Sequence, residues 1–536
     1  MHMLIKKLCQ LCQITRSNSI KNIRKYNVTS VCQDRYILPA DDDNDIIEIE
    51  QTPEIIKKPI IKCKRNEFDF YDGTEYSKYE IVPIACDGWN HLNSRGDFFT
   101  IYPVIQKIDE EENKKLENVT FRDLGITSKL SDIVKKLGYN EPTTIQKYGI
   151  PEILAGQNTM IQAETGTGKT HTYLLPIIDQ IQRWKKLVEP KKNTPLVLIL
   201  APSRELVLQI GNEARKIADD LDISVKSLIG GRTKYLMRNP PVNYVDILIG
   251  TVGLTSKLTT TRVYKLDQIR HTVLDEAHAL FDETYEEKLS HFIKRINFGF
   301  KQTTDATKAP VSSQLTMASA TMPSTYPSYL QRVIDLESIL PIQTKNIHRV
   351  LIPQKFMRLG PQQKPAALLK IMKARTSKKE STLIFCNDTA TCDWMSIFLN
   401  NMNINAVSLH GNMPTPIRRD QYWKFRNGEV SVICTTNSTA RGLDTVTVDC
   451  VINYDFPLNT ADYIHRCGRT GRIGSRQPGR VINFISRKLE IELTKKIERA
   501  TRRNKALPIF DLQDQESEKN DKAMDEEMDQ LLSSSG

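Results

Sequence analysis

Residues 163–170 read AETGTGKT, and this short stretch decides most of the fold. It follows an apolar run typical of a buried strand and precedes a stretch typical of a helix, which is the context that a phosphate-binding loop requires. The glycines let backbone N–H groups face phosphates without a Cβ in the way, and the helix N-terminus adds partial positive charge. A purely structural turn is disfavoured by the GKT that closes the loop. The predicted phosphate contacts are Ala163, Glu164, Thr165, Gly166, Thr167, Gly168, Lys169 and Thr170.

A second motif, VLDEAH at residues 273–278, supplies two carboxylates. An apolar run that ends in an acidic pair places both side chains at the C-terminal end of a strand, where α/β sheets bind ligands. We expect Asp275 to contact Mg²⁺ through water, beside the Thr170 hydroxyl, and Glu276 to orient and deprotonate the attacking water. Lys169 would reach the β- and γ-phosphates. The acidic pair alone could be a helix cap, but together with the loop it predicts a nucleoside triphosphatase.

Short apolar runs alternate with amphipathic stretches in two successive parts of the chain, as buried parallel strands and their crossover helices do. The expected strands are residues 159–163, 196–202, 246–251, 271–275 and 314–318, then 382–387, 405–410, 430–435, 448–454 and 480–485. This rhythm predicts an α/β fold of two tandem units with parallel sheets, at residues 119–343 and 350–507. Residues 38–118 form an extension with no clear period, and the acidic residues 508–536 form a tail that we expect to be disordered.

The composition of the chain favours some classes of binding partner over others. The 536 residues carry a formal net charge of +11, which favours a polyanionic partner without identifying it. No apolar run approaches the roughly 18 residues that a membrane-spanning helix needs, so no membrane partner is expected. Ten cysteines are scattered along the chain. Cys9 and Cys12 form a C-x-x-C that lacks a second pair at zinc-ligand spacing, which favours free thiols in a reducing compartment over a metal site.

The N-terminus reads as a targeting signal. The first 33 residues hold six lysines and arginines and no acidic residue, with apolar residues at near-helical spacing. Basic, acid-free, amphipathic starts of this kind are typical of mitochondrial transit peptides, which predicts a targeting segment at residues 1–37 and a mitochondrial matrix location. The alternatives are a basic arm that touches RNA, and a nuclear or nucleolar location.

Further motifs recur in a fixed order. They are PTTIQ at 142–146 with Phe121 ahead of it, PSREL at 202–206, GG at 230–231, SAT at 319–321, LHG at 409–411, TNSTARGLD at 436–444 and HRCGRTGR at 465–472. Over roughly residues 119–507 this set resembles the DEAD-box ATP-dependent RNA helicases of superfamily 2. The resemblance implies two RecA-like domains that bind ATP and RNA across a cleft, hydrolyse ATP when RNA is bound, and open RNA duplexes locally.

The resemblance also implies roles for individual residues. Further nucleotide contacts would be Phe121, Gln146, Gly442 and Asp444, with Gln146 reading the adenine edge and Phe121 stacking on the base. Catalysis would add His465 and the arginine fingers Arg469 and Arg472, which stabilise charge at the γ-phosphate once the domains close. Coupling between the two sites would use His278, Ser319, Thr321 and Arg466. RNA would lie over Pro202, Arg204, Gly230, Gly231, Thr251, Gly253, His410, Gly411 and Thr436, mostly through its phosphates and sugars.

Four positions depart from the family pattern. His278 replaces the final aspartate of the acidic motif, although the PTTIQ motif and the histidine-first final motif separate the chain from the DEAH translocases. Residues 251–254 read TVGL and lack an arginine that would contact RNA. Thr415 stands in place of a glutamine, and Asn437 in place of an aspartate. These departures keep a second function open, an ATP-gated RNA clamp that hydrolyses little ATP and nucleates a ribonucleoprotein.

The flanking sequences resemble one subgroup of the family, the animal mitochondrial DEAD-box helicases linked to assembly of the large ribosomal subunit. The similar strings include Gly88-Trp89, Asp97-Phe98-Phe99 and the end of the second unit. The resemblance implies a structured, ribosomal RNA partner and ribosome-assembly proteins, with no stable binding to DNA. Basic residues between 495 and 505 have helical spacing, which fits either a solvated face or an extra RNA contact.

Overall fold

The computed structural model describes residues 59–71, 73–77, 80–103, 118–164, 166–230, 233–299, 309–322, 326–344, 348–440, 448–471 and 479–508. All of them belong to one compact unit that spans residues 55–536. The predicted targeting segment, with Cys9 and Cys12, and the acidic tail lie outside the described residues. In the described part of the chain, no helix combines the length and the apolar character needed to cross a bilayer.

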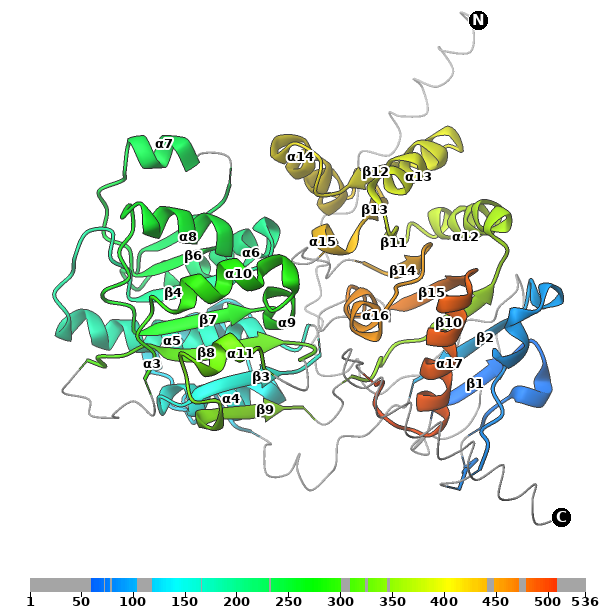
Figure 1. Ribbon diagram of the computed structural model, residues 1–536, viewed down its shortest axis with the longest axis horizontal. Helices are drawn as coiled ribbons and strands as arrows, with labels where there is room; N and C mark the ends of the chain where they lie inside the picture. Colours follow the sequence, from blue (N-terminus) through cyan, green and yellow to red (C-terminus); the bar gives the residue numbers. More distant parts are fainter. Residues whose placement is uncertain are drawn as a thin grey trace, which may run out of the picture. The chain divides into compact units, whose positions relative to one another are not determined.

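The first predicted unit, here called domain 1, is built on a parallel sheet with the strand order β5-β6-β4-β7-β8-β3-β9 (Figure 1). Its strands are β3 (Asn158–Gln162), β4 (Val197–Ala201), β5 (Val225–Leu228), β6 (Ile247–Thr251), β7 (His271–Asp275), β8 (Gln314–Ser319) and β9 (Ile339–Gln343). Five of these were predicted to within two residues. The two unpredicted strands, β5 and β9, lie at the edges, where partial exposure removes the continuous apolar run.

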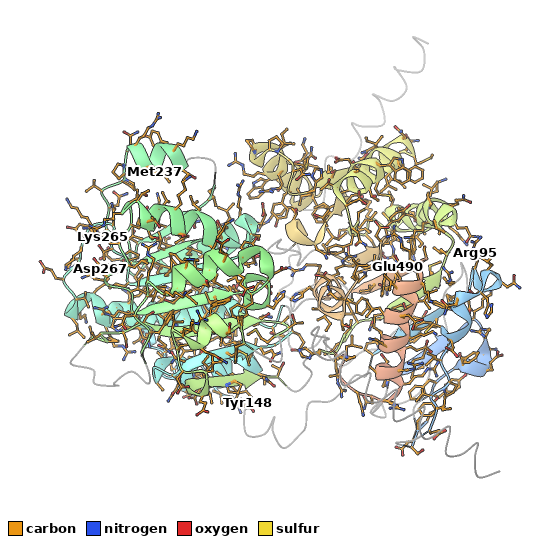
Figure 2. The ribbon with its side chains drawn as sticks, in the orientation of Figure 1. Arg95, Tyr148, Met237, Lys265, Asp267 and Glu490 are labelled. Atoms are coloured by element: carbon orange, nitrogen blue, oxygen red, sulfur yellow. The ribbon has the colours of Figure 1, made fainter. Side chains whose placement is uncertain are left out.

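Helices cover both faces of this sheet because alternate strand residues point to opposite sides. In β4, Val197 and Ile199 belong to one apolar cluster and Leu198 and Leu200 to another. Side chains fill the space between strands and helices (Figure 2). The helices are α3 (Ser128–Lys136), α4 (Thr144–Leu154), α5 (Lys169–Leu187), α6 (Arg204–Ala218), α7 (Thr233–Arg238), α8 (Val252–Thr260), α9 (Ala277–Leu280), α10 (Glu283–Ile293) and α11 (Ser328–Gln331). The predicted motifs therefore gather where strands end and helices begin.

Domain 2 has a larger sheet, ordered β1-β2-β10-β15-β14-β11-β13-β12 (Figure 1). The six strands from β10 onward are parallel. They are β10 (Gln354–Arg358), β11 (Thr382–Phe385), β12 (Ala406–Leu409), β13 (Val432–Thr435), β14 (Cys450–Asn453) and β15 (Arg480–Ile485). The helices are α12 (Lys364–Ser377), α13 (Thr389–Asn401), α14 (Thr415–Arg426), α15 (Asn437–Ala440), α16 (Thr460–Cys467) and α17 (Lys488–Arg502). Together the two sheets confirm the predicted α/β class with two RecA-like domains.

The N-terminal extension joins domain 2, although domain 1 follows it in the sequence. Its strands β1 (Ile60–Cys63) and β2 (Phe98–Tyr102) are antiparallel, and β2 pairs with β10. Phe99 stacks on Phe356 with ring centroids 4.7 Å apart, and the Arg358 guanidinium donates to the carbonyl of Trp89, which is fully buried. Domain 2 is therefore made from two separate parts of the chain.

A buried ion pair on α17 fixes the extension. The Glu498 carboxylate accepts hydrogen bonds from the backbone N–H groups of Ala85 at 2.7 Å and Cys86 at 3.1 Å. Arg502 donates to Glu498 at 2.8 Å and to the carbonyl of Phe68 at 2.6 Å. Both charged side chains are almost fully buried.

This packing corrects the interpretation of the basic stretch at 495–505. Arg502 is buried, Lys495 pairs with Asp87 of the extension at 3.2 Å, and Arg503 donates to the carbonyl of Glu80. These three residues hold the extension. Arg499, Arg503 and Lys505 are exposed, so for the exposed residues a solvated face and an RNA contact both remain predictions.

Candidate active site

The phosphate-binding loop turns into α5 at Gly168, which has φ 96° and ψ 19°, in the left-handed region. Glycine is required here twice over, because an ideal Cβ at Gly168 would also lie 2.5 Å from Gln146 Nε2. Lys169 Nζ donates to the carbonyls of Ala163 and Glu164, both at 2.7 Å. The loop thus surrounds its own lysine at the N-terminus of a long helix, a place that favours anions.

Gln146 joins the start of α4 to this loop. Its Oε1 accepts from the backbone N–H of Thr143 at 2.9 Å, and its Nε2 donates to the carbonyl of Gly168 at 3.3 Å. The side chain is 4% exposed. The predicted adenine-reading residue therefore also supports the phosphate loop.

Asp275 is the last residue of β7 and lies beside the loop. Its Oδ1 accepts from the backbone N–H of Glu276 at 2.9 Å, and its Oδ2 accepts from the Tyr173 hydroxyl at 2.8 Å. Burial, followed by the adjacent Glu276 carboxylate, raises the pKa of Asp275 to about 6. The carboxyl group is thus oriented from both sides and is easier to protonate than an exposed aspartate.

Glu276 holds a strained backbone position. It caps α9 with φ 51° and ψ 51°, a left-handed conformation that costs a residue with a Cβ on the order of 1 kcal/mol or more. One of its carboxylate oxygens lies 3.6 Å from His278 Nδ1, and that nitrogen lies 2.7 Å from the Ser319 hydroxyl. Strain of this kind persists where the surroundings fix it, which fits a residue that must aim its carboxylate.

Motifs from the two domains meet at His465. Its Nε2 lies 2.9 Å from the Thr321 hydroxyl, and its ring stacks on that of His278 with centroids 4.2 Å apart and an angle of 15°. Arg418 Nη2 and the carboxylate of Glu205 form a further link at 2.7 Å. His278 therefore contacts Ser319 through a ring nitrogen and His465 through a ring stack.

Glu276, His278 and His465 also bring potential ligand atoms within 4.8 Å of one another. An imidazole binds a metal along its in-plane nitrogen lone pair at about 2 Å. Two nearly parallel, stacked rings direct those lone pairs side by side and not toward a common point. The cluster is better suited to coupling the domains than to holding an ion.

Arg466 is fixed inside domain 2. It donates to Asn437 Oδ1 at 2.6 Å, Asn387 Oδ1 at 2.7 Å and the Asp455 carbonyl at 2.6 Å. Burial lowers the pKa of Arg466 to about 10. Every hydrogen bond that Arg466 makes with the described residues stays within domain 2, so the predicted coupling to Ser319 and Thr321 would have to pass through its neighbours. Asn437 still supplies the acceptor oxygen that an aspartate would offer.

The predicted RNA contacts lie at strand ends and helix starts. In domain 1, Gly230 lies against the Arg204 guanidinium, since an ideal Cβ on Gly230 would be 2.7 Å from Arg204 Nη2. The Pro202 carbonyl accepts from the Tyr285 hydroxyl at 3.0 Å. Thr251 precedes α8, and Gly253 in its first turn is exposed with open space above it.

In domain 2, His410 follows β12 and its Nε2 lies 2.9 Å from Asp393 on α13. His410 is 6% exposed and Thr436, after β13, is 7% exposed, whereas Gly411 is open to solvent. The set thus offers mainly backbone and small groups, which suits recognition of a phosphate–sugar chain.

Comparisons with known proteins decide the family. A model described as DEAD/DEAH box helicase matches residues 143–328, and one described as Helicase conserved C-terminal domain matches residues 363–474, together more than half of the chain. The chain belongs to the DEAD-box family of ATP-dependent RNA helicases. It is 32% identical to the probable ATP-dependent RNA helicase DDX28 of Mus musculus over 84% of this chain and 85% of that protein, and 30% identical to its Homo sapiens counterpart over the same shares.

Two solved structures share the fold of this chain. The structure of S. cerevisiae Dbp5 bound to RNA and ADP BeF3 matches with a TM-score of 0.59 and 26% identity, over 71% of this chain and 93% of that one. That of Mss116p bound to ssRNA and AMP-PNP matches with a TM-score of 0.60 and 22% identity, over 73% and 79%. As a member of the DEAD-box family, the chain is an RNA-dependent ATPase and helicase.

For several residues, the role predicted from the DEAD-box motifs stays a prediction. Thr165, Gly231, Gly442, Asp444 and Arg472 lie outside the described residues. Arg469, in the turn after α16, donates through Nε to the carbonyl of His465 at 3.2 Å, within domain 2. Phe121 is 3% exposed and packs in the core of domain 1, so its stacking on a base stays a prediction.

Three residues that sequence reasoning missed support the DEAD-box motifs. Tyr173 donates to Asp275, Tyr285 holds the Pro202 carbonyl, and Asp393 holds His410. Tyr173 follows the phosphate loop by one helical turn, and this spacing is the only sequence signal that could have identified it.

Replacement of Gly168 by alanine should remove ATP binding by this DEAD-box protein while the fold survives. The new Cβ would force Gln146 away from the loop and strain a φ of 96°. Fluorescence titration with a labelled ATP analogue measures the loss. Gly138→Ala is the matched control, because Gly138 has φ 94° with open space around it. Equal ATP affinities in the two variants would contradict the close packing of Gln146 and Gly168.

Proposed function

We propose that this helicase uses ATP and Mg²⁺ to open RNA duplexes locally or to remodel RNA–protein complexes during assembly of the mitochondrial ribosome. The observation that carries the catalytic part is the placement of Asp275 and Glu276 at the end of β7, beside the phosphate loop and within reach of His278 and Ser319. A hydrolytic site needs a phosphate cradle and an aimed carboxylate together, and both come from rigid strand ends here.

The residues beside the loop suit Mg²⁺. The Thr170 hydroxyl and the Asp275 carboxylate are oxygen donors, the type that Mg²⁺ prefers, and few protein ligands suffice because this ion keeps several waters. When bound, Mg²⁺ would neutralise charge on the phosphates. We assign these two residues to the ion.

The protein side of the reaction follows from the same geometry. Lys169 would leave the Ala163 and Glu164 carbonyls for the phosphate oxygens, a stronger partner for an ammonium group. Glu276 would accept a proton from the attacking water. His465 would couple closure of the two domains to the site through its contacts with Thr321 and His278. Arg469 and Arg472 would reach the γ-phosphate in the closed state.

Turnover of ATP by the full chain at low salt tests this proposal, with structured RNA, duplex DNA or no nucleic acid. We expect turnover to rise with RNA, to stay low with DNA, and to vanish in the Glu276→Gln variant. Stimulation should fall as salt increases, because phosphate contacts release counterions. ATP-dependent RNA binding without turnover above that of the variant would favour the clamp function.

The mitochondrial part of the proposal is supported by the acid-free, basic first 33 residues and by similarity to DDX28 that covers 84% of the chain. A fusion of residues 1–37 to a fluorescent protein should enter mitochondria, and one with Lys6, Lys7 and Arg16 changed to glutamine should not. Nucleolar fluorescence from the full chain would overturn this location. Crosslinking of the full chain in cells should then recover ribosomal RNA and ribosome-assembly proteins.

The pKa of Asp275 predicts a pH dependence for the metal. Because a proton and the ion compete for this carboxyl, whose pKa is about 6, apparent Mg²⁺ affinity should fall about tenfold per pH unit below 6 and change little above about 7. Titration of Mg²⁺ into the ADP complex between pH 5 and 8 measures this. Asp275→Asn lacks the titrating carboxyl, so its slope gives the contribution of the nucleotide alone. Equal slopes would contradict the prediction.

A further inference from the structure

Tyr173 touches one of the two oxygen donors assigned to the metal. It is on α5, one turn after Thr170, so both side chains lie on the same face of the helix. Its hydroxyl donates to Asp275 Oδ2 at 2.8 Å. The side chain is fully buried. A hydroxyl group from outside the loop therefore contacts a member of the proposed metal site.

The direction of this hydrogen bond follows from what each group can give. An ionised carboxylate only accepts, so the proton between Tyr173 and Asp275 belongs to Tyr173.

The hydrogen bonds to Asp275 leave its carboxylate able to bind the ion. Oδ2 is held by Tyr173 and Oδ1 by the backbone N–H of Glu276, and each oxygen keeps a further lone pair. The carboxylate plane is thus fixed by one side chain and one backbone group.

We propose that Tyr173 is a positioning residue for the divalent metal of this helicase, which orients the Asp275 carboxylate through a buried hydrogen bond. The inference rests on the proposed function, because it assumes that Asp275 serves Mg²⁺. Partners of this kind around a metal ligand typically change metal affinity by about 10- to 100-fold when removed.

The test compares Tyr173→Phe with wild type and with Tyr264→Phe. Phenylalanine keeps the ring and removes only the hydroxyl, and Tyr264 is a matched control because it is a buried tyrosine of domain 1 outside the site. Binding of Mn²⁺ to the full chain, with a non-hydrolysable ATP analogue, is followed by electron paramagnetic resonance. Nucleotide affinity without metal and the Mg²⁺ dependence of ATP turnover are measured beside it.

We expect Tyr173→Phe to weaken Mn²⁺ binding by about tenfold or more, to keep metal-free nucleotide affinity, and to regain turnover at high Mg²⁺. Unchanged Mn²⁺ affinity, equal to that of Tyr264→Phe, would overturn the positioning role alone. A loss of metal-free nucleotide affinity in Tyr173→Phe would also overturn it, since the tyrosine would then shape the loop. Wild type that takes up no Mn²⁺ with the nucleotide would overturn the metal assignment itself.

Discussion

Replacement of Glu276 by glutamine is expected to lower RNA-stimulated ATP turnover by at least about 100-fold, while ATP and RNA binding remain. Glutamine has nearly the same shape as glutamate but cannot accept a proton from water. The change should leave the fold intact, because the position is fixed by the end of β7 and the start of α9. Single-turnover hydrolysis, with binding of a labelled ATP analogue measured in parallel, separates the chemical step from affinity.

A matched control is Glu286→Gln, an acidic residue of α10 in the same domain and outside the motifs. This variant should turn over ATP like wild type. Turnover by Glu276→Gln comparable to that of Glu286→Gln would mean that another group activates the water, and the assignment of the base would be wrong.

Replacement of Glu498 by glutamine should destabilise domain 2 by about 3–5 kcal/mol, the range seen when a buried ion pair loses one partner. The amide keeps the size of the side chain and one acceptor oxygen but leaves the Arg502 charge uncompensated at a site with almost no exposure. The loss also weakens the contacts to the Ala85 and Cys86 N–H groups. Denaturant unfolding followed by intrinsic fluorescence measures the effect, and limited proteolysis shows whether the extension is released.

Two further variants make this result interpretable. Glu492→Gln removes a half-exposed pair with Lys495 on the same helix, while Lys495 keeps its pair with Asp87, and should change stability by no more than about 1 kcal/mol. The double variant Glu498→Leu and Arg502→Met removes both buried charges and should recover part of the loss. An unfolding midpoint for Glu498→Gln equal to that of Glu492→Gln would contradict the anchoring role.

The sequence predicted those parts of the fold whose signal is local. Buried parallel strands such as β7 and β15 are continuous apolar runs, and the predicted bounds of both match the structure. The pairing of β2 with β10 could not be predicted, because it joins residues about 250 positions apart and the extension carries no clear period. The role of Arg502 was hidden for the same reason, since its partners include Phe68 and the Glu498 that binds the extension.

The candidate site shows the same division. Lys169, Asp275 and Glu276 were predictable because their chemistry depends on spacing along the chain. Tyr173 was not, since its importance lies in a contact between α5 and β7. Arg466 reads as a coupling residue in sequence, yet its acceptors are Asn387, Asn437 and the Asp455 carbonyl, which are brought together only by folding.

Because domain 2 is made from two separate parts of the chain, it cannot finish folding until the second part has been synthesised. Strands β1 and β2 leave the ribosome first, but the carboxylate that holds Ala85 comes 413 positions later. The entropic cost of closing a loop rises only slowly with its length, so a loop this long costs little more than a shorter one. Contacts between residues so far apart in the sequence nevertheless slow folding. Domain 1, which is made from the middle of the chain, can therefore fold before α17 is synthesised, whereas domain 2 cannot. A nascent chain released before Glu498 would hold its first two strands to domain 2 without the anchoring carboxylate, and loss of that hairpin would expose β10 as an open sheet edge that invites aggregation.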